Sequence, residues 1–137
     1  MQARIAVEGL AEFNRGLRKL DSEAPKQLRI ALNGAADLLI TRARPKVPSR
    51  SGNARASMKA QSTRTSARVS VGGRKAPYFP WLSFGGAGRL PGRPAKRPFI
   101  REGRDIYPTL REISPEIERS LQDAIAQVAR NAGLEVD

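Results

Sequence analysis

The chain has 137 residues, of which 39% are hydrophobic, enough for one domain with a modest core. It contains no Cys and no His, which excludes disulfides, thiolate zinc sites and catalysis by a His base or a Cys nucleophile. The 25 Lys and Arg residues outnumber the 13 Asp and Glu residues, for a net charge of +12.

The positive charge is concentrated in the middle of the chain. Residues 41–104 carry 16 basic side chains and one acid, Glu102, whereas residues 105–137 carry 3 basic and 7 acidic ones. Such a block favours a polyanion, or an acidic face on a partner subunit. No segment is apolar enough to span a membrane and the first residues are no secretory signal, so we expect a soluble intracellular protein without a membrane partner.

The N-terminal third predicts a strand and two helices. Residues 3–7 alternate weakly, as in a short strand. Apolar residues at helical spacing predict a short helix over 10–20 and a longer one over 22–43, which Pro45 and Pro48 end. Residues 48–53 are typical of a loop.

The middle of the chain predicts strands and an arm. Residues 56–63 and 67–71 suggest a hairpin with a turn at 63–66, and residues 77–84 suggest a third strand with Pro80 at an edge or a bend. Gly, Pro, Arg and Lys dominate residues 85–98, which predicts an extended basic loop or arm.

The C-terminal third gives the strongest helical signal. Apolar residues recur every three or four positions from Ile106 to Val128, and Pro115 should split or kink this helix. Residues 131–137 are expected to fray. The element order predicts a single α+β domain over 1–137, with a small antiparallel sheet of three or four strands packed against the long N-terminal-half helix and the C-terminal helix.

Five of the seven aromatic residues cluster around the predicted third strand: Tyr78, Phe79, Trp81, Phe84 and Phe99. On an exposed face beside basic residues, such rings could stack on single-stranded nucleic acid. In a chain so poor in aromatics, we expect them instead to fill the core or a subunit interface, with alternate rings pointing inward.

Other candidate sites carry weaker signals. The stretch GGAGRLPG lacks the pattern of a phosphate-binding loop. Acidic residues from Asp105 to Asp123 lie mostly off the apolar stripe, so we expect a solvated face or partners for a neighbour's arginines. We expect no catalytic residue, metal or cofactor. The basic residues predicted to face a subunit interface or DNA are Arg50, Arg55, Arg89, Arg93, Lys96, Arg97 and Arg101.

The order of motifs resembles the gene-product-ten-like tail-component family of long-tailed phages. The motifs are Val7 to Leu10 before the first helix, Val47 to Ser57 after the second, Val69 to Gly72, the aromatic stretch Tyr78 to Gly86, and Arg97 to Arg101. Ser83 stands where members often have Glu, and Gly86 where they often have Thr.

This resemblance implies a structural virion protein at the head–tail junction, made in the host cytoplasm. It implies a homo-oligomeric ring, a hexamer or dodecamer, that contacts connector or stopper and tail proteins while DNA passes through its lumen. Tail completion, tail terminator and neck roles all remain open. The arm could touch DNA or a neighbouring subunit, and we favour the neighbour. The alternative function is a small basic nucleic-acid-binding protein; a nuclease fits least well.

Overall fold

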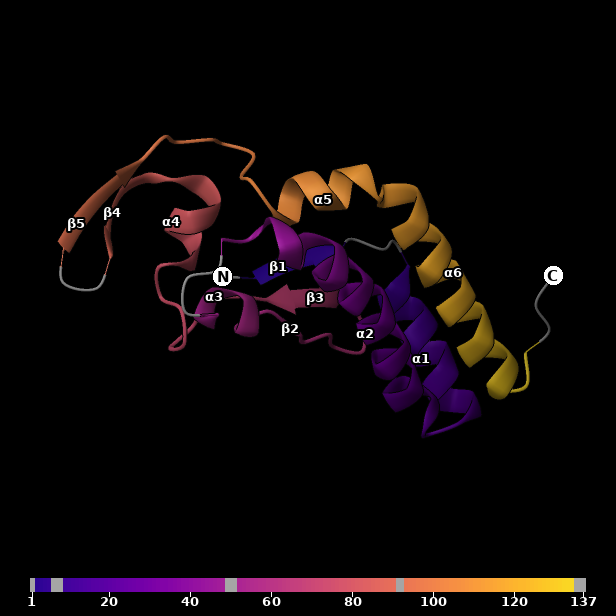
Figure 1. Ribbon diagram of the computed structural model, residues 1–137. Helices are drawn as coiled ribbons and strands as arrows, with labels where there is room; N and C mark the ends of the chain where they lie inside the picture. The colour runs from indigo at the N-terminus through magenta and orange to yellow at the C-terminus, as the bar shows by residue number, and fades with distance from the viewer. Residues whose placement is uncertain (1, 6–8, 49–51, 91–92, 135–137) are drawn as a thin grey trace.

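The computed structural model describes residues 2–5, 9–48, 52–90 and 93–134, and it confirms the predicted α+β class. In Figure 1 a body of helices and a small sheet carries a two-stranded hairpin, which projects at the end away from α6. The helices are α1 (Leu10–Leu20), α2 (Ala24–Ala43), α3 (Asn53–Ala56), α4 (Phe79–Phe84), α5 (Ile106–Glu112) and α6 (Ser114–Asn131). The strands are β1 (Gln2–Ile5), β2 (Lys59–Ala60), β3 (Ala67–Ser70), β4 (Gly86–Leu90) and β5 (Arg93–Arg97).

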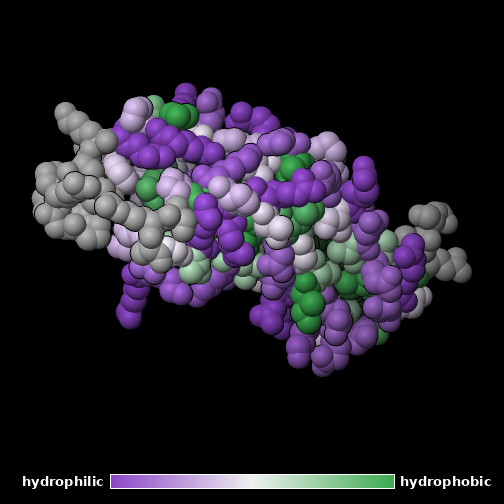
Figure 2. All heavy atoms as spheres, viewed as in Figure 1, coloured by the Kyte–Doolittle hydropathy of each residue, from purple (hydrophilic) through white to green (hydrophobic). Residues whose placement is uncertain are grey.

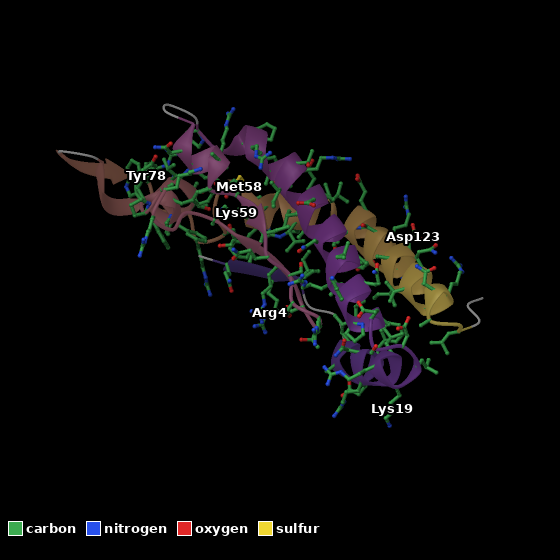
Figure 3. All side chains as sticks on the ribbon, turned by 90° about the horizontal axis from the view of Figure 1, so that it is seen from below. Arg4, Lys19, Met58, Lys59, Tyr78 and Asp123 are labelled. Atoms are coloured by element: carbon green, nitrogen blue, oxygen red, sulfur yellow. The ribbon has the colours of Figure 1, made fainter. Side chains whose placement is uncertain are left out.

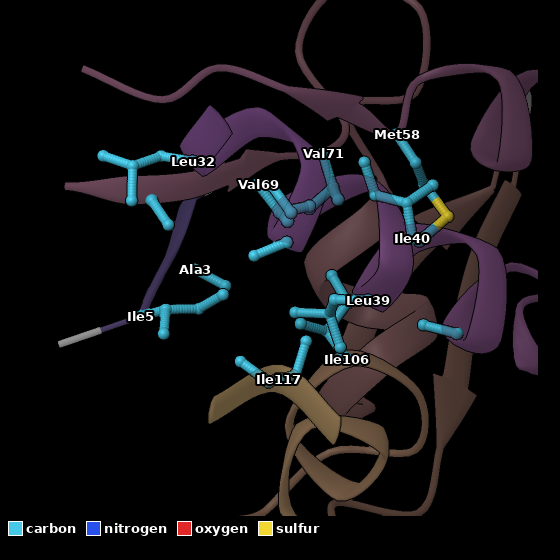
Figure 4. Packing of buried hydrophobic residues seen from close by; sticks show 14 of the residues in the cluster. Ala3, Ile5, Leu32, Leu39, Ile40, Met58, Val69, Val71, Ile106 and Ile117 are labelled. Atoms are coloured by element: carbon cyan, nitrogen blue, oxygen red, sulfur yellow. The ribbon is translucent and has the colours of Figure 1, made fainter. Parts of the chain in front are cut away.

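The body's sheet is antiparallel, with the strand order β1-β3-β2. Side chains alternate between its faces, and Ala3, Ile5, Ala67 and Val69 are buried on the same face. Figure 4 shows several of these side chains among the apolar residues of α2. The N-terminal strand and the strand near 67–71 are therefore confirmed, although residues 6–7 of the predicted strand lie outside the described residues.

Helix α2 lies at the centre of the body and contacts the sheet, α1, α5 and α6. Its Leu28, Leu32 and Leu39 are fully buried at helical spacing. Pro25 is tolerated in the first turn, where its missing N–H would have no partner in the helix. Pro45 follows the last turn, within a 3₁₀ turn. The two helices predicted in the N-terminal third are thus confirmed.

The C-terminal helix is divided as predicted, because α5 ends at Glu112 and α6 begins at Ser114 with Pro115 in its first turn. The end of α6 differs from the prediction of a frayed tail from 131. Gly133 has φ +91°, and the N–H groups of Gly133 and Leu134 donate to the carbonyls of Arg130 and Ala129. This pattern satisfies the last carbonyls of the helix. Residues 135–137 lie outside the described residues.

The region after α2 contains less strand than predicted. Gly52, with φ +84°, leads into the short helix α3, and β2 comprises only two residues of the predicted strand 56–63. Thr63 and Ser66 form a bridge around the predicted turn. The Ser57 hydroxyl donates to the Ala54 carbonyl and accepts the Gly72 N–H at 2.9 Å, which joins α3 to the end of β3.

The prediction of a strand over 77–84 is wrong, because α4 occupies most of that segment. Pro80 lies in the first turn of α4, where no intrahelical hydrogen bond is lost, whereas in a strand it would lack a ladder donor. Phe79, Leu82 and Ser83 are buried on one face at a spacing of three to four residues. The helical period therefore buries the apolar part of this segment.

The arm predicted over 85–98 is a β-hairpin rather than an irregular loop. Strands β4 and β5 pair antiparallel, from Gly86 opposite Arg97 to Leu90 opposite Arg93. Main-chain hydrogen bonds hold such a ladder without an apolar side-chain pattern, so composition alone could not distinguish it from a loop. The hairpin Gly86–Arg97 is termed the arm below.

Candidate interaction site at the root of the arm

The arm joins the body where α4 ends and where the chain returns toward α5, over residues 83–86 and 97–105, here termed the arm root. Gly85 has φ +84° and its N–H donates to the Trp81 carbonyl at 2.7 Å. A Cβ on Gly85 would lie 2.1 Å from the Pro98 carbonyl oxygen. Only glycine lets the outgoing and returning chains pass this closely. The Ile100 N–H then donates to the Phe84 carbonyl at 2.8 Å.

The guanidinium of Arg104 joins the two chains at the root. Its Nη1 donates to the Ser83 carbonyl at 3.2 Å, and its Nη2 donates to the Pro98 carbonyl. Hydrogen bonds from a charged donor are stronger than neutral ones. One side chain therefore connects the segment that enters the arm to the segment that leaves it.

Behind Arg104 lies Asp105, whose side chain is fully buried. Its Oδ1 accepts hydrogen bonds from the Ser83 hydroxyl at 3.1 Å and from the Ile106 N–H at 2.6 Å, at the start of α5. Burial raises the pKa of this carboxyl above 3.8, and the bonds from Ile106 and Ser83 oppose that rise. The expectation that Asp105 belongs to a solvated acidic face is therefore wrong.

Aromatic side chains support the root from the α4 side. The Trp81 indole N–H donates to the Gly86 carbonyl at 3.1 Å, and the Arg97 guanidinium lies 5.8 Å from the centre of its ring. The rings of Phe84 and Tyr107 are 6.0 Å apart, so they couple α4 to α5.

The five predicted aromatic residues occupy different environments. Phe79 is fully buried in the core, Tyr78, Trp81 and Phe84 are partly buried, and Phe99 is 69% exposed. The expected alternation of inward and outward rings along a strand is wrong because these rings follow the helical period of α4. Phe99 instead protrudes beside Ile100, which is 39% exposed.

Those predicted basic residues whose side chains the structure describes have different surroundings. Arg55 donates from Nε to the Val47 carbonyl at 2.8 Å, so it braces the segment after α2. Arg97 covers Trp81, whereas Arg101 is exposed in the turn after Ile100. Three other predicted residues lie on the strands of the arm, and only their backbone is described: Arg89, Arg93 and Lys96. Arg50 lies outside the described residues.

Two of the C-terminal acids have partners within the chain. Arg42 pairs with Glu116 at 2.8 Å and Lys46 pairs with Glu112 at 2.9 Å, which ties the end of α2 to α5 and α6. The described residues contain no group of three or more His, Cys, Asp or Glu side chains placed to hold a metal ion. Within the same residues, no helix is both long and apolar enough to cross a membrane.

Comparison with protein-family models, curated proteins and solved structures finds no match to this chain. The site is therefore defined by its own geometry: a braced root, a basic hairpin beyond it and an exposed phenylalanine at its base. Sequence reasoning missed the roles of Ser83, Arg104 and Asp105. The available signal was an Asp directly before the apolar run that begins at Ile106, which is typical of a helix N-cap.

Proposed function

We propose that this protein is a structural virion component of a tailed phage, which forms a homo-oligomeric ring at the head–tail junction. The observation that carries the proposal is the arm, which projects from the body and has an exposed Phe99 at its base. The backbone of the hairpin projects from the body in Figure 1, with its main contact to the body at α4, and such a projection suits contact with a neighbouring subunit. The order of sequence motifs adds the resemblance to phage tail components.

The composition of the arm root supports a protein contact. Interfaces are enriched in aromatic and Arg side chains that act as anchors. Phe99 and Ile100 protrude between Arg97 and Arg101. Figure 2 shows a mostly hydrophilic face with scattered apolar patches, and among the exposed large hydrophobic residues of the described chain Phe99 has the largest exposed fraction.

Charge distribution supports a head-to-tail arrangement of subunits. The middle of the chain is basic and the C-terminal residues are net acidic. On α6, Glu118 and Asp123 are exposed and take part in no ion pair within the described residues. A basic arm that reaches an acidic helix on the next copy is a heterologous contact, and such contacts form a ring when the rotation between copies closes. In this arrangement connector or stopper and tail proteins flank the ring.

Electron microscopy of purified virions tests the placement. The expected result is density for this chain at the neck, and its absence from that region contradicts the proposal. Sedimentation of the purified protein tests the contact itself. Phe99→Ala should shift the mass distribution toward monomer, whereas Ile30→Ala, which alters an exposed residue on α2, should not. An unaltered distribution for Phe99→Ala excludes Phe99 as an anchor.

A second candidate function is a small basic nucleic-acid-binding protein. A specific observation favours it, namely a group of cations on one face of the sheet. This group includes Arg4 and Arg68, which lie directly opposite each other on β1 and β3. It is distinct from the arm.

A further inference from the structure

One face of the three-stranded sheet is open. Helix α2 packs on the face that carries Ala3 and Val69. On the other face, the alternation places Arg4 of β1, Lys59 of β2, and Arg68 and Ser70 of β3. Within the described residues, no helix covers this side. Figure 3 shows Arg4 on the side of β1 away from α2.

Two arginines on this face are cross-strand neighbours. Arg4 lies directly opposite Arg68 in the antiparallel register. Like charges in that position destabilise a sheet unless an anion lies between them. No strand of this sheet contains Asp or Glu, and the acid nearest to β1 in sequence, Glu8, lies outside the described residues. The ion pairs found among the described residues involve neither arginine.

Arg68 also carries a buried donor without a partner. Its Nε is shielded from solvent and makes no hydrogen bond within the described structure. Arginine nitrogens only donate, so the missing partner must be an acceptor. The positive charge of Arg68 is therefore not neutralised by any hydrogen-bond acceptor at Nε within the described structure.

More cations surround a hollow at the end of the same face. The hollow has a volume of about 260 Å³ and is lined by Lys59, Ser70, Gly73, Arg74 and Lys75, among others. Ser70 lies opposite Lys59 in the register of β2 and β3, and it is two residues from Arg68 on the same face. The hollow therefore adjoins the pair of Arg4 and Arg68 on this face. Gly72 and Gly73 both have positive φ values, and the turn that they form carries Arg74 and Lys75.

We infer that the open sheet face binds the phosphodiester backbone of a nucleic acid, without sequence specificity. Its cations are Arg4, Lys59, Arg68, Arg74 and Lys75. Phosphate contacts require only cations and polar donors, and arginine is well suited to paired phosphate oxygens. An acidic protein partner fits less well, because the large exposed apolar residues (Leu20, Ile30, Phe99, Ile100 and Leu134) all lie outside this sheet. The inference stands without a ring and moves the expected nucleic-acid contact from the arm to the sheet.

The test is fluorescence anisotropy of a labelled DNA duplex, titrated with the full chain at several salt concentrations. The wild type should bind at low salt, with affinity that falls steeply as salt rises. A variant with all five cations of the face changed to Gln should lose most of this affinity. The slope of log affinity against log salt should flatten by about 0.9 for each phosphate contact removed.

Two variants serve as controls. Changing five exposed cations on α1 and α2 to Gln removes the same charge from elsewhere; the substitutions are Arg15→Gln, Arg18→Gln, Lys19→Gln, Lys26→Gln and Arg29→Gln. Arg89→Gln, Arg93→Gln and Lys96→Gln remove three of the four charges of the arm and leave Arg97, which covers Trp81. Both variants should keep most of the wild-type salt slope. The melting temperature of the five-cation variant should equal or exceed that of the wild type, because Arg4→Gln and Arg68→Gln remove a like-charge repulsion; a loss of binding would then not be a loss of folding.

Any of four results would overturn the inference. The wild type would fail to bind the duplex at low salt, or the five-cation variant would bind as the wild type does, or the arm variant would lose as much affinity as the sheet variant. Binding of polyglutamate in place of DNA would indicate an acidic protein partner and would also overturn it. None of these results decides whether the chain lies at the neck of a virion, so the two proposals fail separately.

Discussion

The body around α2 and the arm root are held by different forces. In the body, long apolar side chains from α2, β1, β3, α5 and α6 are buried together, and burial provides the stability. At the arm root, the two chain segments are held by a close backbone approach at Gly85, by hydrogen bonds from the Arg104 guanidinium and by hydrogen bonds to the buried carboxyl of Asp105. The arm should therefore open without unfolding of the body, because within the described residues the hairpin strands contact the body mainly at α4.

Truncation of a core residue should have the largest effect. Leu39 is fully buried on α2, and Leu39→Ala should lower the free energy of unfolding by about 2–5 kcal/mol. Ile30 lies on the same helix and is 53% exposed, so Ile30→Ala should change stability by less than about 0.5 kcal/mol. Urea denaturation measures both. Similar losses would show that α2 is not the centre of the core.

A side chain at Gly85 should open the arm root. The added methyl of Gly85→Ala would meet the Pro98 carbonyl, and the positive φ adds strain of about 1–3 kcal/mol. Amide hydrogen exchange should then accelerate over residues 86–100 and change little in α2. Gly86 has φ +95° with open space around it, so Gly86→Ala isolates the strain from the collision. Equal acceleration in both variants would exclude the close approach as the cause.

The buried carboxyl of Asp105 should give a pH-dependent effect. Its pKa is raised in the folded state, so the folded protein binds the proton more tightly than the unfolded chain. The contribution of Asp105 to stability is therefore greatest below pH 3.8 and is lost as the pH rises through the raised pKa. Asp105→Asn cannot titrate and keeps an oxygen for Ser83 and Ile106. Its stability relative to the wild type should rise as the pH increases above 3.8.

Thermal unfolding over a pH series measures this difference. Asp105→Ala is the matched variant, because it removes the acceptor and should cost about 1–3 kcal/mol from the donors left unpaired. A wild-type profile parallel to that of Asp105→Asn would mean that the carboxyl titrates normally. If Asp105→Asn and Asp105→Ala lose equal stability at neutral pH, the oxygen that accepts the hydrogen bonds of Ser83 and Ile106 is unimportant for stability.

The smallest effect is expected for the surface ion pairs. Lys46 and Glu112 meet at 2.9 Å with both side chains more than a third exposed, so their coupling should be about 0.2–1 kcal/mol. A double-mutant cycle with Lys46→Met and Glu112→Gln measures it, and added salt should weaken it. The exposed pair of Arg15 and Glu12 at 3.6 Å on α1 gives a reference. A coupling above this range would assign these pairs a role in docking α5 and α6.

Much of the body could be predicted from the sequence, because its helices carry regular apolar stripes. Leu28, Leu32 and Leu39 define α2, and the repeat from Ile106 to Val128 defines α5 and α6. A proline alone does not distinguish the start of a helix from a bend in a strand. Pro25 and Pro80 both lie in the first turn of a helix, but only Pro25 is followed by a long stripe of apolar residues at helical spacing. The arm was missed as a hairpin because its pairing depends on main-chain groups rather than on side-chain pattern.

The contacts at the arm root and on the open sheet face could not be predicted in the same way. The hydrogen bond from Arg104 to the Ser83 carbonyl forms because two segments far apart in the sequence meet in the fold, and no local sequence pattern indicates this contact. The juxtaposition of Arg4 and Arg68 depends on the register of two strands far apart in the sequence. Their alternation with buried Ala3, Ala67 and Val69 was visible, and it could have placed both arginines on the uncovered face.

The central position of α2 also sets the order in which this chain can fold. Arg42 and Glu116 are 74 residues apart, so the side of α2 that contacts α6 is covered only after that length of chain has been made, although the sheet and α1 cover other parts of α2 earlier. Such long-range contacts slow folding and leave apolar surface uncovered while the chain is being synthesised. Helix α2 is therefore fully covered only once α6 has been made. A fragment that ends before α6 should leave apolar side chains of α2 exposed and be prone to aggregation.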